Sequence, residues 1–119
     1  MEVIYGNPPS KSNSYRIITI NGRGSLTKTK ALKEYEEKFM LQCRSRNKNI
    51  QSLFEFHINV FYPSKRSDLD GVLKVVLDCL QKVNAIKNDN NCIKIVAQKF
   101  IDKINPRVEY EIIEVLSPL

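Results

Sequence analysis

The sequence has few of the residues that build thiolate metal sites or disulfide scaffolds. It contains one histidine, three cysteines and no tryptophan. Three is an odd number, and no two of the cysteines have the close spacing of a zinc finger, so we expect no structural zinc site. Cys43, Cys79 and Cys92 are therefore expected to be reduced thiols in or near the core.

Long apolar runs are also absent. No stretch approaches the roughly 18 uncharged apolar residues that a membrane-spanning helix needs. The first residues, MEVIYGNPPS, lack the basic and apolar regions of a signal peptide, so we expect a cytoplasmic protein. The sequence has no internal repeats and no low-complexity linker, and its 119 residues predict one domain that spans residues 1–119.

Positive charge, in contrast, is in excess. The chain has 19 Lys and Arg against 13 Asp and Glu, a formal net charge of +6. This excess favours an anionic partner, and nucleic acid is the leading candidate. The alternative is a basic protein whose charge serves solubility alone.

The N-terminal half combines strand and helix patterns. Asn21-Gly22 lies between two strand-like runs and is a strong hairpin signal. Apolar residues then recur at three- and four-residue steps, which predicts a helix over 29–46 with Thr29 as its N-cap. In chain order, the sequence predicts strands at 1–5, 15–20 and 23–27, a helix at 29–46, a strand at 51–62, a helix at 68–83, and strands at 93–101 and 108–112.

The strand predicted at 51–62 has the clearest pattern, because apolar and polar residues alternate along it. His57 falls on the polar side, so we interpret it as a half-exposed strand residue; no partner pattern supports a catalytic role. The order of elements, β-β-β-α-β-α-β-β, predicts an α+β fold in a single domain. We expect a mixed or antiparallel sheet packed by two main helices.

The most informative stretch is P-S-K-R-S-D-L-D-G-V-L-K-V-V-L-D-C-L, residues 63–80. Asp68 and Asp70 follow a basic loop, and Lys74 and Asp78 continue the same side of the predicted helix at four-residue steps. The apolar residues of this helix form a stripe on the other side. A polar loop beyond the helix supplies Asp89.

These acids allow two interpretations. Asp68 can cap the helix, and Asp70 can pair with the helix dipole or with Lys74 as an ordinary surface ion pair. Alternatively, the carboxylates bind a divalent metal. Mg²⁺ fits such oxygen ligands better than zinc does, and it serves phosphodiester hydrolysis by polarising a phosphoryl oxygen and activating water. A nearby lysine can stabilise the transition state.

Three motifs in order resemble those of the RusA family of Holliday junction resolvases. N-P-P-S-K-S-N-S-Y resembles the N-terminal P-P-S loop of the family, and D-L-D-G-V-L-K resembles its D-x-D-N-x-x-K helix. N-D-N-N-C-I is similar to its D-D-x-x-V segment. The sequence departs from the family at Asn88, where an acid is usual, at Gly71, where asparagine is usual, and at Ser67, where a basic residue is frequent.

The resemblance implies cleavage of four-way DNA junctions by a homodimer that makes paired, symmetric nicks, with Mg²⁺ as cofactor and Mn²⁺ as a substitute. It implies that Asp68, Asp70 and Asp89 bind the metal and that Lys74 is the essential lysine. The residues that it assigns to DNA contact come from two segments: Ser10, Lys11, Ser12, Asn13 and Ser14 from the first, and Lys65, Arg66 and Ser67 from the second.

Two other functions remain open from the sequence. The first is a nucleic-acid-binding module without chemistry, in which the acids are caps and Lys11, Arg23, Lys65 and Arg66 provide the basic surface. The second is an interaction protein that pairs through the edge of its sheet. The final strand, E-Y-E-I-I-E-V-L, would suit such pairing, although its glutamates are typical of edge protection.

Overall fold

The computed structural model describes residues 1–9 and 14–116. Its elements follow the order predicted from the sequence, and no helix within the described residues is long and apolar enough to cross a membrane. The elements are β1 (Glu2–Tyr5), β2 (Tyr15–Ile20), β3 (Arg23–Lys28), α1 (Lys30–Gln42), β4 (Leu53–Tyr62), α2 (Leu69–Lys82), a 3-10 turn (Asp89–Asn91), β5 (Cys92–Ile101) and β6 (Arg107–Val115).

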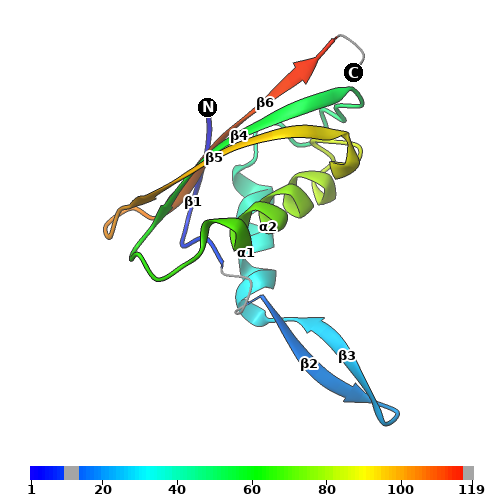
Figure 1. The fold of residues 1–119 in the computed structure, drawn as a ribbon. Helices are drawn as coiled ribbons and strands as arrows, with labels where there is room; N and C mark the ends of the chain where they lie inside the picture. Colours follow the sequence, from blue (N-terminus) through cyan, green and yellow to red (C-terminus); the bar gives the residue numbers. More distant parts are fainter. Residues whose placement is uncertain (10–13, 117–119) are drawn as a thin grey trace.

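Four strands form the main sheet, in the order β1-β6-β4-β5. β4 and β5 run parallel and the other neighbours run antiparallel, so the sheet is mixed, which is one of the two arrangements predicted. Both helices pack on one face of this sheet (Figure 1). α2 connects the two parallel strands, which places its first turn at the carboxyl end of β4 and its last turn near the start of β5.

The alternation of β4 determines where the core lies. Phe54, Phe56, Ile58, Val60 and Tyr62 are all at most 1% exposed and face the helices. The intervening residues, including His57, are half-buried on the face that the helices leave uncovered. The predicted alternation, and the half-exposed position of the histidine, are both confirmed. Cys43 and Cys79 are buried and Cys92 is half-buried, all three as free thiols.

The final strand is at an edge of the sheet over part of its length only. β6 pairs with β4 along residues 107–115 but with β1 only along 107–110, so residues 111–115 have β4 as their one sheet neighbour among the described residues. Pairing of another chain along 107–110 is excluded because β1 occupies that side, whereas pairing along 111–115, and the interpretation of the glutamates there as edge protection, stay predictions. Glu109 and Glu111 lie opposite Asn59 and His57 of β4, on the uncovered face.

The first helix ends earlier than predicted, at Gln42 instead of Arg46. The amides of Arg44 and Ser45 both donate to the carboxylate of Glu2, at 2.7 and 3.1 Å, and this draws the chain towards β1. The amide of Asn47 then donates to the carbonyl of Val83 in the loop after α2. Contacts that are distant in sequence therefore replace the last helical turn.

β2 and β3 form a separate two-stranded sheet that projects from the body of the protein (Figure 1). Asn21 and Gly22 have φ values of 52° and 77°, as a type I′ turn requires, so the hairpin signal is confirmed. At the base of the hairpin, the amide of Thr29 donates to the carbonyl of Ser14 at 3.0 Å. Thr29 also caps α1, because its hydroxyl accepts from the amide of Leu32.

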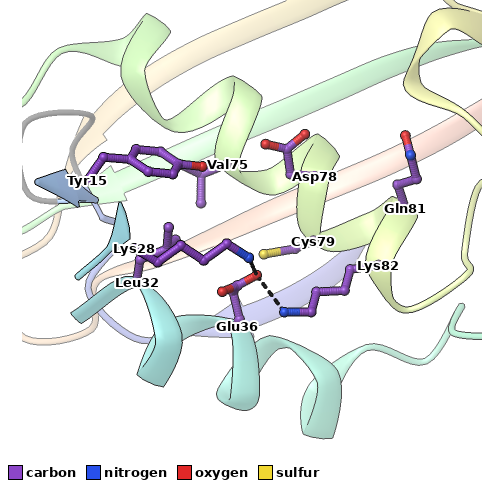
Figure 2. Close-up of a pocket in the computed structure, with 9 residues that line it drawn as sticks. All are labelled: Tyr15, Lys28, Leu32, Glu36, Val75, Asp78, Cys79, Gln81 and Lys82. Atoms are coloured by element: carbon purple, nitrogen blue, oxygen red, sulfur yellow. Dashed lines mark hydrogen bonds and ion pairs between the residues drawn. The ribbon is translucent and has the colours of Figure 1, made fainter. Parts of the chain in front are cut away.

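One carboxylate holds the base of the hairpin against both helices. Glu36 of α1 accepts from Lys28 of β3 at 2.9 Å and from Lys82 of α2 at 3.0 Å (Figure 2). Its side chain is 11% exposed. Burial acts to raise the pKa of Glu36, but the hydrogen bonds from the two ammonium groups outweigh it, so the pKa lies below its ordinary value.

This arrangement predicts an acid-sensitive contribution to stability. Since the pKa of Glu36 is lower in the folded protein than the ordinary value of 4.5, the contribution is present above about pH 4.5 and is lost as the pH falls through the folded pKa. We expect Glu36→Gln to lower the melting temperature at pH 7, and the difference from the unsubstituted protein to shrink below pH 4.5. Glu37→Gln, an exposed neighbour, is the matched control. Equal melting curves for both variants at pH 7 would contradict the role.

Candidate active site

The informative stretch lies at the carboxyl end of β4, where one buried side chain fixes the start of α2. Pro63 ends the strand after Tyr62, which is fully buried. The Tyr62 hydroxyl donates to the backbone carbonyl of Asp68 at 3.0 Å, and α2 begins at the next residue. The strand therefore positions the N-terminus of the helix directly.

Asp68 and Asp70 occupy this N-terminus. Asp68 is the N-cap residue, as predicted, but its carboxylate makes no capping hydrogen bond. Both residues are exposed, and within the described part of the chain neither carboxylate has a hydrogen-bond or ion-pair partner. Burial, followed by these two negative charges, raises the pKa of Tyr62 to about 12. No group in the described part of the chain therefore competes with an external cation for these two carboxylates.

Lys74 lies one turn beyond Asp70 and joins α2 to the loop that precedes β5. Its ammonium contacts Asp78 Oδ1 at 2.9 Å and also contacts Asp89 Oδ2. The hydrogen bonds from Lys74 to Asp89 and then to Asp78 raise the pKa of the lysine, so it stays protonated at any physiological pH. The pairing of Lys74 with Asp70 that the sequence left open is not the one formed.

The loop that carries Asp89 is fixed by its own hydrogen bonds. The Asp89 amide donates to Oε1 of Gln81 in the last turn of α2, at 3.0 Å. Asn88, which stands where the family usually has an acid, caps the 3-10 turn: its Oδ1 accepts from the amide of Asn90 at 2.8 Å. Asn88 thus stabilises the conformation of the loop. The loop places Asp89 against the same face of α2 as Lys74.

The basic loop before α2 is supported by a residue that the sequence did not identify as functional. Lys99 of β5 donates to the carbonyls of Lys65 at 3.2 Å and of Ser67 at 2.9 Å. Lys65 and Arg66 remain exposed above it. The available signal was a lysine at an inward position of the otherwise apolar alternation in β5, where a charged group is unusual.

Of the two segments assigned to DNA contact, the second is described in full and the first only at Ser14. Ser64, Arg66 and Ser67 of the second segment line a cavity of about 430 Å³ together with Lys38 of α1 and residues 6–9, which precede the first segment. Ser14 is fully buried, and its carbonyl is bound to the amide of Thr29. The other predicted contacts, Ser10, Lys11, Ser12 and Asn13, lie outside the described residues.

The carboxylates suit a hard cation in chemical type. Their arrangement divides them, with Asp68 and Asp70 at the first turn and Asp78 and Asp89 around Lys74. Within residues 1–9 and 14–116, no three His, Cys, Asp or Glu side chains lie close enough together to hold one metal ion. Mg²⁺ commonly binds through one or two carboxylates, with water and substrate phosphate completing the shell. The predicted ligand set of Asp68, Asp70 and Asp89 therefore stays a prediction. The third of these acids, Asp89, is paired with Lys74.

The support that Lys99 gives to the basic loop can be tested directly. We expect Lys99→Met to increase amide hydrogen exchange over residues 64–70 by roughly tenfold or more, since two hydrogen bonds from a charged donor are lost. Lys94→Met, on the same strand, is the matched control because the ammonium of Lys94 makes only a 4.0 Å contact with Glu55 among the described residues. Equal exchange in both variants would show that Lys99 does not hold the loop.

Comparison with known proteins adds one positive finding. The family model described as endodeoxyribonuclease RusA matches residues 6–113, nearly the whole chain. The matched region includes the basic loop, α2 and the loop that carries Asp89. A search of curated proteins gave no match.

Proposed function

The chain belongs to the RusA family of endodeoxyribonucleases, and on that basis we propose that it cuts branched DNA, with the four-way junction as its substrate. The reaction is metal-dependent hydrolysis of a phosphodiester bond. The observation that carries the proposal is the face of α2, where two carboxylates at the first turn, without a partner among the described residues, are followed by a lysine held between two further acids.

The residues on this face have complementary roles. Asp68 and Asp70 would hold Mg²⁺, or Mn²⁺ in its place; Asp89, which is paired with Lys74 here, is the third ligand that the family resemblance implies. When bound, the ion would polarise a phosphoryl oxygen and lower the pKa of a bound water. Lys74 provides a fixed positive charge beside the acids, where it stabilises the negative charge that develops on the phosphoryl oxygens in the transition state. Asp78 keeps the lysine oriented along the helix.

The basic loop supplies the attraction that the acids lack. The two negative charges of Asp68 and Asp70 repel a DNA backbone, so cations must lie close by. Lys65 and Arg66 are exposed immediately before Asp68, and Lys99 fixes the loop that carries them. Contacts of these two side chains with phosphate would position the scissile bond without reading the sequence of the bases.

A four-way junction has two equivalent strands to cut, which favours two equivalent active sites. We infer that the active form is a homodimer, because closed two-fold assemblies are the commonest way for one chain to supply two symmetric sites. Paired nicks across the junction then follow from the symmetry, one from each copy.

Substitution of Asp70 tests DNA cleavage and DNA binding separately. We expect Asp70→Asn to lower the rate of junction cleavage by at least about a hundredfold, in line with the loss of one transition-state-stabilising group. Junction binding should be equal or tighter, because the substitution removes negative charge beside phosphate. Cleavage gels with Mg²⁺ and binding assays in EDTA measure the two effects.

Glu37→Gln is the matched control, since it removes one exposed negative charge from α1. Normal cleavage by Asp70→Asn would show that the metal assignment is wrong. If the unsubstituted protein binds junctions but makes no nicks with either Mg²⁺ or Mn²⁺, the non-catalytic binding module becomes the better description.

Lys74 gives a second, independent test. We expect Lys74→Gln to lower the cleavage rate by roughly 10²–10³-fold, because the fixed charge at the reacting phosphate is lost. The same change should make Mn²⁺ bind more tightly in calorimetry, since the ammonium no longer competes for Asp89 and Asp78. Lys87→Gln, an exposed lysine in the loop beyond α2, is the control. Unchanged cleavage and unchanged Mn²⁺ affinity would each count against this role.

A further inference from the structure

The excess positive charge of the chain is confined to one stretch. Residues 3–33 contain no Asp or Glu, and the other Lys and Arg of the chain equal its 13 acids in number. The whole net charge of +6 is therefore located in this stretch, which includes the β2–β3 hairpin. Its basic residues are Lys11, Arg16, Arg23, Lys28, Lys30 and Lys33.

The hairpin stands away from the body of the protein (Figure 1). The radius of gyration is 15.0 Å and the longest dimension is 48 Å, whereas a compact domain of this length has a radius of gyration of about 13.5 Å. An isolated two-stranded hairpin is at best marginally stable in water. An arm of this kind therefore adds little to the core and is suited to contact with a partner.

One face of the arm is apolar and unusually exposed. The register places Ile17 opposite Leu26, and these side chains are 76% and 71% exposed. The opposite face carries Ile18 and Ile20 together with Arg16 and, beside the turn, Arg23, and both arginines are exposed. The long arginine side chains can reach past the edges of a ribbon that is only two strands wide.

The base of the arm adjoins the candidate active site. Tyr15 and Lys28 belong to the same face as Ile17 and Leu26, because side chains two residues apart point the same way. Both line a cavity of about 280 Å³ together with Asp78 of α2 (Figure 2). A ligand that extends from the acidic face of α2 would therefore pass along the apolar face of the arm.

We propose that the β2–β3 hairpin is a second DNA-binding element, which lies in a groove of one arm of the branched substrate. The proposal rests on the function proposed above. The major groove admits a two-stranded β-ribbon, and apolar side chains there contact thymine methyl groups. Ile17 and Leu26 face the base edges, and Arg16 and Arg23 reach the flanking phosphates.

The charge of the arm favours DNA over a second copy of the chain. Two arms that approach each other bring together only positive charges, because the hairpin contains no acid to pair with Arg16 or Arg23. The phosphate backbone provides the complementary charge along its whole length.

The test measures binding of a labelled four-way junction in EDTA, by fluorescence anisotropy at several salt concentrations. The variants are Arg16→Gln with Arg23→Gln, and Ile17→Ser with Leu26→Ser. The control is Lys48→Gln with Lys103→Gln, which removes the same charge from exposed positions elsewhere.

The two hairpin variants should change junction binding in different ways. Loss of two phosphate contacts makes the negative slope of log K against log salt shallower by about 1.8. The apolar variant should bind roughly tenfold more weakly with an unchanged slope, and the control should keep both affinity and slope. Melting temperatures and light scattering on all variants monitor folding and mass.

The outcomes distinguish this inference from the proposed function. If the unsubstituted protein binds the junction and both hairpin variants bind as the control does, the inference is overturned and the function stands. If the unsubstituted protein does not bind the junction, both are overturned. A fall in molecular mass in the hairpin variants would show that the arm joins two copies of the chain, which also overturns the DNA assignment.

Discussion

The hydrogen bond from the buried Tyr62 hydroxyl to the carbonyl of Asp68 is the constraint on which the candidate site depends. It joins the last residue of the most deeply buried strand to the residue that precedes α2. Because the core fixes β4, it also fixes where the helix begins and therefore where Asp70 and Lys74 point. The buried Tyr62 side chain thus determines where the exposed residues at the start of α2 lie.

Lys74 is the second connection, and it explains why the acids can coexist on one surface. Like charges that lie near each other on one surface repel unless an opposite charge intervenes. The ammonium lies between Asp78 and Asp89 and offsets both. Asp68 and Asp70 have no such partner among the described residues, so the electrostatic demand for a cation is concentrated at the first turn, next to the basic loop.

The sequence predicted most of the local structure, because the signals for it are local. The Asn21-Gly22 turn and the Thr29 cap are each decided by a few neighbouring residues, and both are confirmed. The sequence did not predict that β6 lies between β1 and β4 or that Lys99 supports the loop before Asp68. Both depend on contacts between segments that are distant in the chain. The alternation of residues within one strand carries no information about such contacts.

The distribution of charge divides the molecule in a way that fold alone does not require. The body of the protein is electrically balanced, and the acids that we propose for catalysis lie on it; the excess of cations is carried on a stretch that includes a projecting arm. A uniformly basic surface would neutralise the carboxylates that we propose as metal ligands. Separating the two allows the arm to attract a polyanion over a Debye length of about 8 Å at physiological salt, while Asp68 and Asp70 keep their negative charge at the point where the phosphodiester bond would be cut.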